Sequence, residues 1–316
     1  MKSTSTSWRE RMMPYLVVVH QSGTRNRIRP RPTRMNVVTV PEPSKAKSIF
    51  MAGVLIAFSA VVAAAQTSDL VQRSLLRVCA DPANLPFSSE DRDGFENKIA
   101  DLLGERLGLP VVYEWFPQAT GFVRQTLASK KCDIIMGYAQ GHELVQNTNH
   151  YYRSSYVMLV PDAGKLNGIK NLDDERLKSS RIGVTAGTPP ATVLALNSLM
   201  GNVEPYPLMV DRRHESPAER MIGDLKSGKI DVALLWGPIG GYYAKIAGGD
   251  FAVVPLVAES KGPRMAYRIT FGIRRGEIDW KRKLNDLIKQ NQSEINKIML
   301  EFGVPILDES NKLISE

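Results

Sequence analysis

Two stretches of the chain carry the same junction between a helix and a strand, at an offset of 98 residues. One runs from Leu127 to Tyr138 (LASKKCDIIMGY) and the other from Leu225 to Trp236 (LKSGKIDVALLW). Leu, Ser, Lys, Asp and a final aromatic residue recur at matching positions. Chance similarity is the alternative, because Lys and Asp are common in such loops. The surrounding patterns favour two lobes of one design.

Strand and helix patterns alternate around both junctions. Apolar residues at helical spacing predict a helix over 95–107, which Gly108 ends. Ser216 to Glu219 forms a capping box with Pro at the first helical position. The first copy reads strand 76–80, helix 95–107, strand 111–115, helix 120–129 and strand 132–138; the second reads strand 181–184, helix 188–200, helix 217–228 and strand 230–236. Each copy predicts an α/β layer with a parallel sheet covered on both faces.

Two β-rich segments, 151–161 and 266–273, connect the copies. Helix patterns over 279–290 and 293–302 follow the second segment. We therefore expect the chain to leave the first lobe, build the second and return. Lobe 1 is predicted to comprise 66–155 plus 270–316, and lobe 2 to comprise 156–269. Two crossings beside a cleft make a hinge.

Residues 1–65 read as a leader. They hold ten Lys or Arg and two Asp or Glu, so they carry the whole formal charge of +8. Residues 66–316 are neutral, which argues against a nucleic-acid-binding body. Lys45 and Lys47 precede an uncharged stretch that ends Ala63-Ala64-Ala65, as in a secretory signal peptide.

We predict cleavage between Ala65 and Gln66 and a location in the periplasm, with membrane contact only during export. An uncleaved anchor helix is the alternative, since about 17 apolar residues are the lower limit for a span. Residues 1–34 contain seven arginines. Translation that begins at Met35 would make this stretch an artefact, and a basic arm for nucleic acid is the other interpretation.

The body holds two cysteines, Cys79 and Cys132. An exported pair can form a disulfide, although sequence alone cannot supply the geometry. C-x-x-C spacing is absent, and the three histidines of the body have no ligand spacing. No metal site is expected.

Polar residues follow the first strand of each lobe, where ligands bind in open α/β sheets. Asp81 and Asn84 are expected to make polar contacts at the cleft floor, or else to form turns. Thr185 and Thr188 lead into a helix start, where free N–H groups bind anions. An ordinary N-cap by Thr188 is the alternative reading, and both can hold.

Aromatic residues gather at predicted strand ends and adjacent turns. They are Trp115, Phe116, Phe122, Tyr138, Trp236, Tyr242 and Tyr243. Core packing is the plain interpretation for most of them. Tyr138 and Trp236 are instead expected to face each other across the cleft, because the Gly237-Pro238 that follows Trp236 argues against simple continuation of strand or helix. This predicts an aromatic-walled, charge-poor cleft that suits an apolar peptide or a planar molecule.

The order of several motifs resembles that of a known family. The motifs are Cys79-Ala-Asp-Pro82, Asn84-Leu-Pro-Phe-Ser88, Gly94-Phe-Glu-Asn-Lys-Ile-Ala100, Trp115-Phe-Pro-Gln118 and Trp236-Gly-Pro238. From Leu76 to Leu307 the chain resembles periplasmic solute-binding proteins of the type II fold. Within them it resembles the J proteins associated with quinoprotein (PQQ) methanol dehydrogenases.

This resemblance implies two α/β lobes joined by a two-strand hinge around a central cleft. It also implies a periplasmic accessory protein that binds a PQQ-dependent methanol or alcohol dehydrogenase and assists its assembly or activation. PQQ and metal would belong to the dehydrogenase, so the chain needs no cofactor of its own. Phe87, within one of the motifs, joins the expected partner-binding residues of the cleft.

Amino-acid-binding relatives hold the ligand carboxylate with an Arg after the third strand and its ammonium with an Asp in lobe 2. The corresponding segment here is 137–144, which lacks Arg, and Trp236 falls at or next to the Asp position. Unpaired buried charges cost several kcal/mol, so tight amino-acid binding is disfavoured. A transporter's solute-binding protein for another small ligand is the alternative function. An enzyme is not expected, and the protein is expected to be a monomer.

Overall fold

The computed structural model describes residues 73–315, which fall in one compact unit. The predicted leader, the start at Met35 and the cleavage site between Ala65 and Gln66 lie outside the described residues. Within 73–315, no helix is both long enough and apolar enough to cross a membrane.

A nine-stranded mixed sheet forms the centre of the unit, in the order β4-β1-β5-β11-β6-β9-β7-β8, with β10 also paired to β6. The strands are β1 (Leu76–Ala80), β2 (Ala83–Asn84), β3 (Ser88–Ser89), β4 (Val111–Trp115), β5 (Ile134–Ala139), β6 (Gln146–Pro161), β7 (Ile182–Thr185), β8 (Val203–Tyr206), β9 (Val232–Trp236), β10 (Phe251–Pro255) and β11 (Ala266–Ile273). Strands β2 and β3 form a separate two-stranded ribbon.

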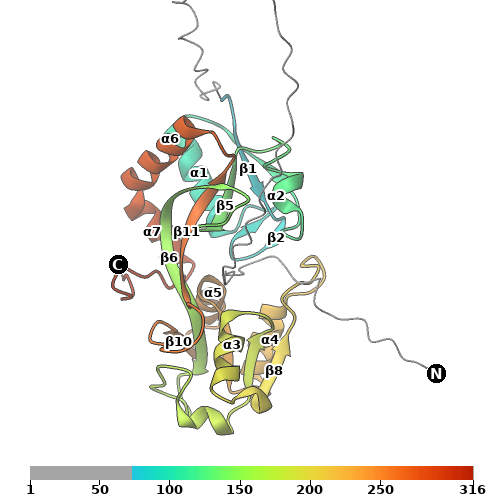
Figure 1. Ribbon diagram of the computed structural model, residues 1–316, viewed down its shortest axis with the longest axis vertical. Coiled ribbons are helices and arrows are strands. Elements are labelled where there is room, and N and C mark those ends of the chain that lie inside the picture. The colour runs from blue at the N-terminus through green and yellow to red at the C-terminus, as the bar shows by residue number, and fades with distance from the viewer. Residues whose placement is uncertain (1–72, 316) are drawn as a thin grey trace, which may run out of the picture. The chain divides into compact units, whose positions relative to one another are not determined.

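Helices cover the sheet at both ends of the unit (Figure 1). They are α1 (Phe95–Leu107), α2 (Phe122–Gln125), α3 (Pro189–Leu196), α4 (Pro217–Lys226), α5 (Gly237–Ile246), α6 (Ile278–Gln290) and α7 (Gln292–Glu301), with 3-10 turns η1 (Glu175–Ser179) and η2 (Met200–Asn202). The predicted mixed α/β architecture is confirmed by this arrangement. Strands β1, β4 and β5 run parallel, as do β7, β8 and β9.

Strand β6 belongs to both halves of the sheet. Its first part, up to Ser155, pairs with β11, and its last part pairs with β9 and β10. We use lobe 1 for the β4-β1-β5-β11 half with α1, α2, α6, α7 and the C-terminal tail, and lobe 2 for the other half. Figure 1 shows β6 running from one lobe into the other. The exact predicted lobe boundaries stay a prediction.

Local sequence accounts for the clearest helices. Helix α1 spans the predicted residues and ends at Gly108, whose φ of 67° is left-handed. Its N-terminus is held by Asn97, whose Oδ1 accepts from the Gly94 N–H at 3.1 Å. Helix α4 begins after Ser216, whose Oγ accepts from the N–H of Glu219 at 3.2 Å. Side chains of both helices that face the sheet are buried.

Two helix predictions were wrong. The helix expected over 120–129 is a single turn, α2, because Gly121 is left-handed at its start and the Thr126 hydroxyl bonds back to the carbonyl of Phe122. Gly237-Pro238 does not interrupt the chain but opens helix α5. Pro lacks the N–H that the first helical turn leaves unbonded and has a helical φ, so it starts a helix readily.

Candidate functional site

A cavity of about 230 Å³ lies between the lobes. Lobe 1 contributes Asp81 and the segment 117–119, and lobe 2 contributes the segment 208–213. These segments follow β1, β4 and β8, which lie in two parallel sets of strands. The cavity therefore lies where the sequence places it, beyond the carboxyl ends of the strands.

Asp81 orders the lobe 1 side of this cavity. Its side chain is buried, and its two carboxylate oxygens accept the N–H groups of Ala83 at 2.9 Å and Gln118 at 2.7 Å. Asp81 therefore joins the turn after β1 to the loop after β4. The Asp81 side chain thus both lines the cavity and stabilises the turn after β1.

Asn84 connects the two lobes. Its Nδ2 donates to Oε1 of Gln118 at 2.9 Å, and its Oδ1 accepts from a guanidinium N–H of Arg212. Arg212 belongs to the loop between β8 and α4, so this hydrogen bond crosses the cleft. We call this contact the front latch. The sequence analysis missed Arg212, although the charged run 211–215 (DRRHE) just before the Ser216 cap marks its loop.

Charges of both signs line the cleft. Hydrogen bonds from Arg213 lower the pKa of Asp211 to about 2, so this carboxylate is ionised at neutral pH. Arg213 contacts it through two N–H groups at 2.9 and 2.6 Å. Among the described residues that line the cavity there is no aromatic side chain. The prediction of an aromatic-walled, charge-poor cleft was therefore wrong.

Trp236 lies in the core and not at the cleft mouth. Only 8% of it is exposed, and its ring packs edge-on against Tyr156 at 5.3 Å and Tyr267 at 5.9 Å between ring centres. Tyr138 belongs to a different buried cluster, beside Cys79 and His142. The two rings thus do not face each other, because each is buried against side chains of its own neighbourhood.

Three further aromatic candidates lie away from the cavity. Phe87 packs on Phe95 at 5.3 Å, and Trp115 stacks on Tyr113 at 4.5 Å between ring centres. Tyr242 lines a second cavity of about 360 Å³, together with Lys245, Ile246, Glu301 and Phe302. A role of Phe87, Trp115 or Tyr242 in partner binding is not tested by these contacts and remains a prediction.

Thr185 and Thr188 lie at the junction of β7 and α3. The Thr188 hydroxyl donates to the carbonyl of Thr185 at 2.6 Å, and its side chain makes no capping hydrogen bond to the helix. Neither residue is among those that line the 230 Å³ cavity. The expected anion site at this helix start remains a prediction.

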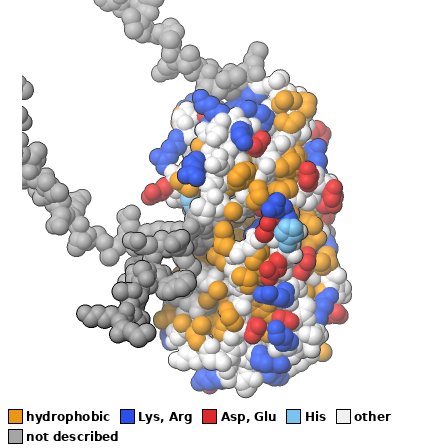
Figure 2. Space-filling view, turned by 90° about the vertical axis from the view of Figure 1, so that its right-hand side faces the viewer, with side chains coloured by type: hydrophobic (Ala, Val, Ile, Leu, Met, Phe, Trp, Pro, Cys, Tyr) orange, Lys and Arg blue, Asp and Glu red, His pale blue; other side chains and the backbone are white. Residues whose placement is uncertain are grey.

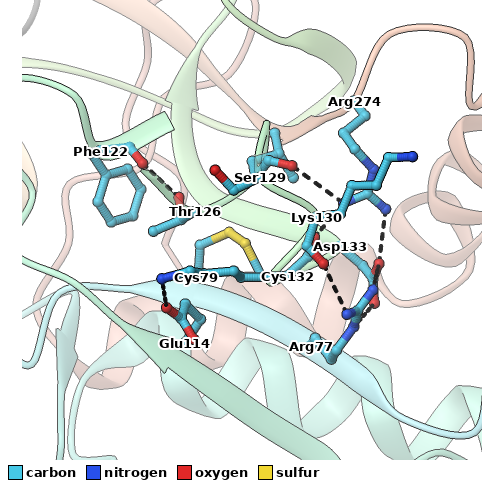
Figure 3. The surroundings of a disulfide bond; sticks show 12 residues. Arg77, Cys79, Glu114, Phe122, Thr126, Ser129, Lys130, Cys132, Asp133 and Arg274 are labelled. Atoms are coloured by element: carbon cyan, nitrogen blue, oxygen red, sulfur yellow. Dashed lines mark hydrogen bonds and ion pairs between the residues drawn. A yellow bond between two sulfur atoms is a disulfide. The ribbon is translucent and has the colours of Figure 1, made fainter. Parts of the chain in front are cut away.

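Cys79 and Cys132 form a disulfide between the end of β1 and the residue two before β5 (Figure 3). Both are buried, in a cluster with Phe122 and Leu127. The described residues contain no group of three or more His, Cys, Asp or Glu that could hold a metal ion.

Asp133, next to this disulfide, forms ion pairs with three arginines. Arg77 contacts the carboxylate with two N–H groups at 2.9 and 2.7 Å, Arg274 contacts it at 2.8 Å, and Arg73 also forms an ion pair with it. Burial alone would raise the pKa of Asp133, but the arginine hydrogen bonds outweigh it and hold the pKa at about 2. Figure 3 shows Arg77 and Arg274 converging on this carboxylate. The cluster fixes the start of β1 to the end of β11.

Glu96 is a buried carboxyl group that the sequence analysis did not single out. Burial raises its pKa to about 8, and no hydrogen bond or ion pair to its carboxylate occurs among the described residues. A Cβ atom at Gly137 would collide with its Oε1 atom, so the carboxyl group lies directly on the backbone of β5. Tyr151 and Tyr152 of β6 are the ionisable groups close to it. The motif 94–100 contained the residue, but only the packing reveals its burial.

With this geometry defined, sequence comparison decides the family. The pattern of bacterial extracellular solute-binding proteins, family 3, matches residues 76–303. The chain belongs to this family. Among solute-binding proteins of family 3, relatives of the J type are similar to it over most of its length. Protein MoxJ of Methylorubrum extorquens (strain AM1) is 29% identical over 306 residues, which cover 88% of this chain and 100% of MoxJ.

Solved structures of the same kind superpose on this family 3 chain. Periplasmic binding protein XoxJ from Methylobacterium extorquens AM1 is 42% identical, with a TM-score of 0.64, over 74% of this chain and 100% of XoxJ. MxaJ from Methlophaga aminisulfidivorans MPT is 24% identical, with a TM-score of 0.62, over 73% of this chain and 100% of MxaJ, and shares the fold. The expected resemblance to the J-type proteins is therefore confirmed.

Proposed function

We propose that the protein is a periplasmic binding protein that associates with a PQQ-dependent methanol or alcohol dehydrogenase and assists its assembly or activation. The family consists of extracellular proteins, which supports a location outside the cytoplasmic membrane. Identity of 42% over the whole of XoxJ is the observation that carries the proposal. The protein acts by binding, without catalysis and without a cofactor of its own, and it works as a monomer.

The cleft supports a protein partner better than a small solute. Its cavity of about 230 Å³ is smaller than the roughly 300–1,000 Å³ of ordinary ligand pockets. The front latch, Arg212 to Asn84, already occupies polar groups of both lobes. Beside the latch, Leu85 is 40% exposed and Met209 is 49% exposed. Figure 2 shows hydrophobic side chains gathered along the middle of one face of the unit.

Capture from the periplasm tests this function. A C-terminally tagged protein, isolated from cells growing on methanol, should bring down a quinoprotein dehydrogenase identified by mass spectrometry. The purified protein should also raise the activity that the apo-dehydrogenase recovers when PQQ and metal are added. Normal dehydrogenase activity in a strain that lacks the gene would contradict the assembly or activation role.

A matched pair of variants locates the binding surface. Met209→Asp places a charge beside the cleft, and Met200→Asp places one at a comparably exposed methionine, 51%, on η2 outside the lining of the cavity. We expect Met209→Asp to weaken dehydrogenase capture about tenfold, equivalent to about 1.4 kcal/mol. Met200→Asp should leave capture unchanged. Equal capture by both variants would move the interface away from the cleft.

Transport of a small, non-amino-acid solute is the second candidate, because the family binds solutes. The segment 137–144, which comprises the end of β5 and the loop after it, offers no arginine for an amino-acid carboxylate. Arg153, the next one along, donates instead to the carbonyl of Asp308 and to Oδ1 of Asn311 in the C-terminal tail. Calorimetry with a panel of amino acids should therefore detect no binding near 1 μM, or about 8 kcal/mol. Sub-micromolar binding of any solute would favour transport.

A further inference from the structure

The lobes meet a second time, away from the cleft, where α5 of lobe 2 lies against the end of α7 in lobe 1. Lys245 Nζ donates to the carbonyl of Glu301 at 2.6 Å. The ring of Tyr242 stacks on Phe302, with 6.3 Å between ring centres and 22° between the planes. We call this contact the rear seam. The second cavity, of about 360 Å³, lies along it.

In the rear seam, the main chain of α5 at Gly241 lies directly against the segment 303–305. A Cβ atom on Gly241 of α5 would lie 2.8 Å from Cδ of Pro305 and still closer to the carbonyl oxygen of Gly303. Gly303 has a left-handed φ of 73°, and its own Cβ would lie 2.7 Å from the carbonyl oxygen of Gly241. A main-chain atom cannot rotate away as a side chain can. Because packed interiors are dense, α5 cannot approach this segment further without distortion.

The C-terminal tail joins the rear seam to the hinge strands. Ser154 Oγ on β6 donates to the carbonyl of Pro305 at 2.8 Å, and the Leu307 N–H donates to the carbonyl of Arg153 at 2.8 Å. Further along the tail, Glu309 forms an ion pair with Arg268 of β11 at 2.5 Å. The tail therefore contacts β6, the strand that runs from one lobe into the other, and its neighbour β11, close to where β6 changes partners from β11 to β9.

We infer that the lobes are clamped in one arrangement from both sides of the hinge, by the front latch across the cleft and by the rear seam behind it. A rotation that widens the cleft must break the hydrogen bond from Arg212 to Asn84 and press α5 against Gly303 and Pro305. The protein thus presents one preformed surface across both lobes and does not open to admit a ligand into the cleft. This inference concerns the protein alone, so it stands or falls independently of the proposed partner.

Distance measurements between spin labels test the clamp. Labels are attached to cysteines that replace Lys98 on α1 and Lys226 on α4, both exposed. The wild-type background should give one narrow distance distribution. Gly241→Ala should shift or broaden it by more than about 2 Å, the size of a genuine rearrangement. Gly223→Ala is the matched control, because a Cβ there meets no atom within 4 Å, and it should reproduce the wild-type distribution.

Each result is decisive. A broad or two-peaked distribution in the wild-type background overturns the inference without any variant. A folded Gly241→Ala protein with the wild-type distribution overturns the role of the rear seam. If Gly241→Ala does not fold, Lys245→Ala combined with Tyr242→Ala removes the seam's side-chain contacts and should broaden the distribution in its place. Removing the front latch alone, by Arg212→Ala, should widen the distribution less than removing the seam.

Discussion

Replacing Glu96 with Gln should remove most of a pH-dependent loss of stability. The folded protein holds the Glu96 proton up to a pKa of about 8, whereas the unfolded chain releases it near the ordinary value of 4.5. Between these pH values the unfolded state therefore binds fewer protons than the folded state. Stability then falls as the pH rises, because ionisation of the unfolded chain favours unfolding.

The magnitude follows from the width of this interval. Each pKa unit corresponds to about 1.4 kcal/mol. The contribution of Glu96 is fully favourable below pH 4.5 and declines as the pH rises from 4.5 to about 8. The loss amounts to about 3 kcal/mol at pH 7 and about 5 kcal/mol above pH 8. Gln resembles the protonated carboxyl group in shape, so Glu96→Gln should match wild type at pH 4.5 and exceed it at pH 8.

Urea unfolding at pH 4.5, 6, 7 and 8, followed by tryptophan fluorescence, measures the difference. Burial lowers the pKa of His142, whose titration acts in the opposite direction, so the two proteins are compared at each pH. Glu90→Gln, at an exposed position of the same lobe, is the control and should track wild type. A constant difference between Glu96→Gln and wild type from pH 4.5 to 8 would refute the reasoning, since it would mean that Glu96 ionises equally in both states.

Three other changes test the core. Replacing Cys79 and Cys132 with Ser opens a cross-link over 53 residues and should cost about 4 kcal/mol in urea unfolding; a loss below 1 kcal/mol would contradict a constraining disulfide. Trp236→Ala should lower the free energy of unfolding by about 3–5 kcal/mol, as expected for a core ring. A melting temperature close to that of wild type would contradict a core position of the ring. Asp133→Asn should cost about 3 kcal/mol by leaving three partly buried arginines without the buried carboxylate that pairs with them, and high salt should not restore it.

The sequence predicted those helices and strands whose apolar spacing and end residues lie within the element itself or directly beside it. Helix α1 begins and ends at the predicted residues because its buried face repeats at helical spacing and Gly108 stops it. Strands β5 and β9 follow from apolar runs that come directly after charged turns, 130–133 and 229–231. Helix α5 was not predicted because Gly237-Pro238 was interpreted as a break in regular structure, although Pro is also common in the first turn of a helix.

The candidate site depended on contacts between distant residues. Asp81 lines the cavity because its position after β1 is a property of the strand order, and its role in binding remains a prediction. The hydrogen bond from Arg212 to Asn84 joins residues 128 positions apart, and no local pattern specifies it. Trp236 turned inward because Tyr156 and Tyr267, from other strands, form its surroundings. Periodicity predicts which residues follow a strand but not which way a terminal ring points.

The strand order also determines which strand pairs can form early in folding and which must form late. Strand β5 pairs on one side with β1, which precedes it in the chain, but on the other side with β11, which begins only at Ala266. Until that late segment arrives, β5 presents an open edge of unpaired N–H and C=O groups, the kind of edge that recruits other chains into aggregates. Pairing across so many intervening residues is slow. The sheet of lobe 1, which begins with β1, is therefore completed only by β11, the last strand in the chain. A chain truncated before Ala266 should aggregate and should not yield a free, folded lobe 1.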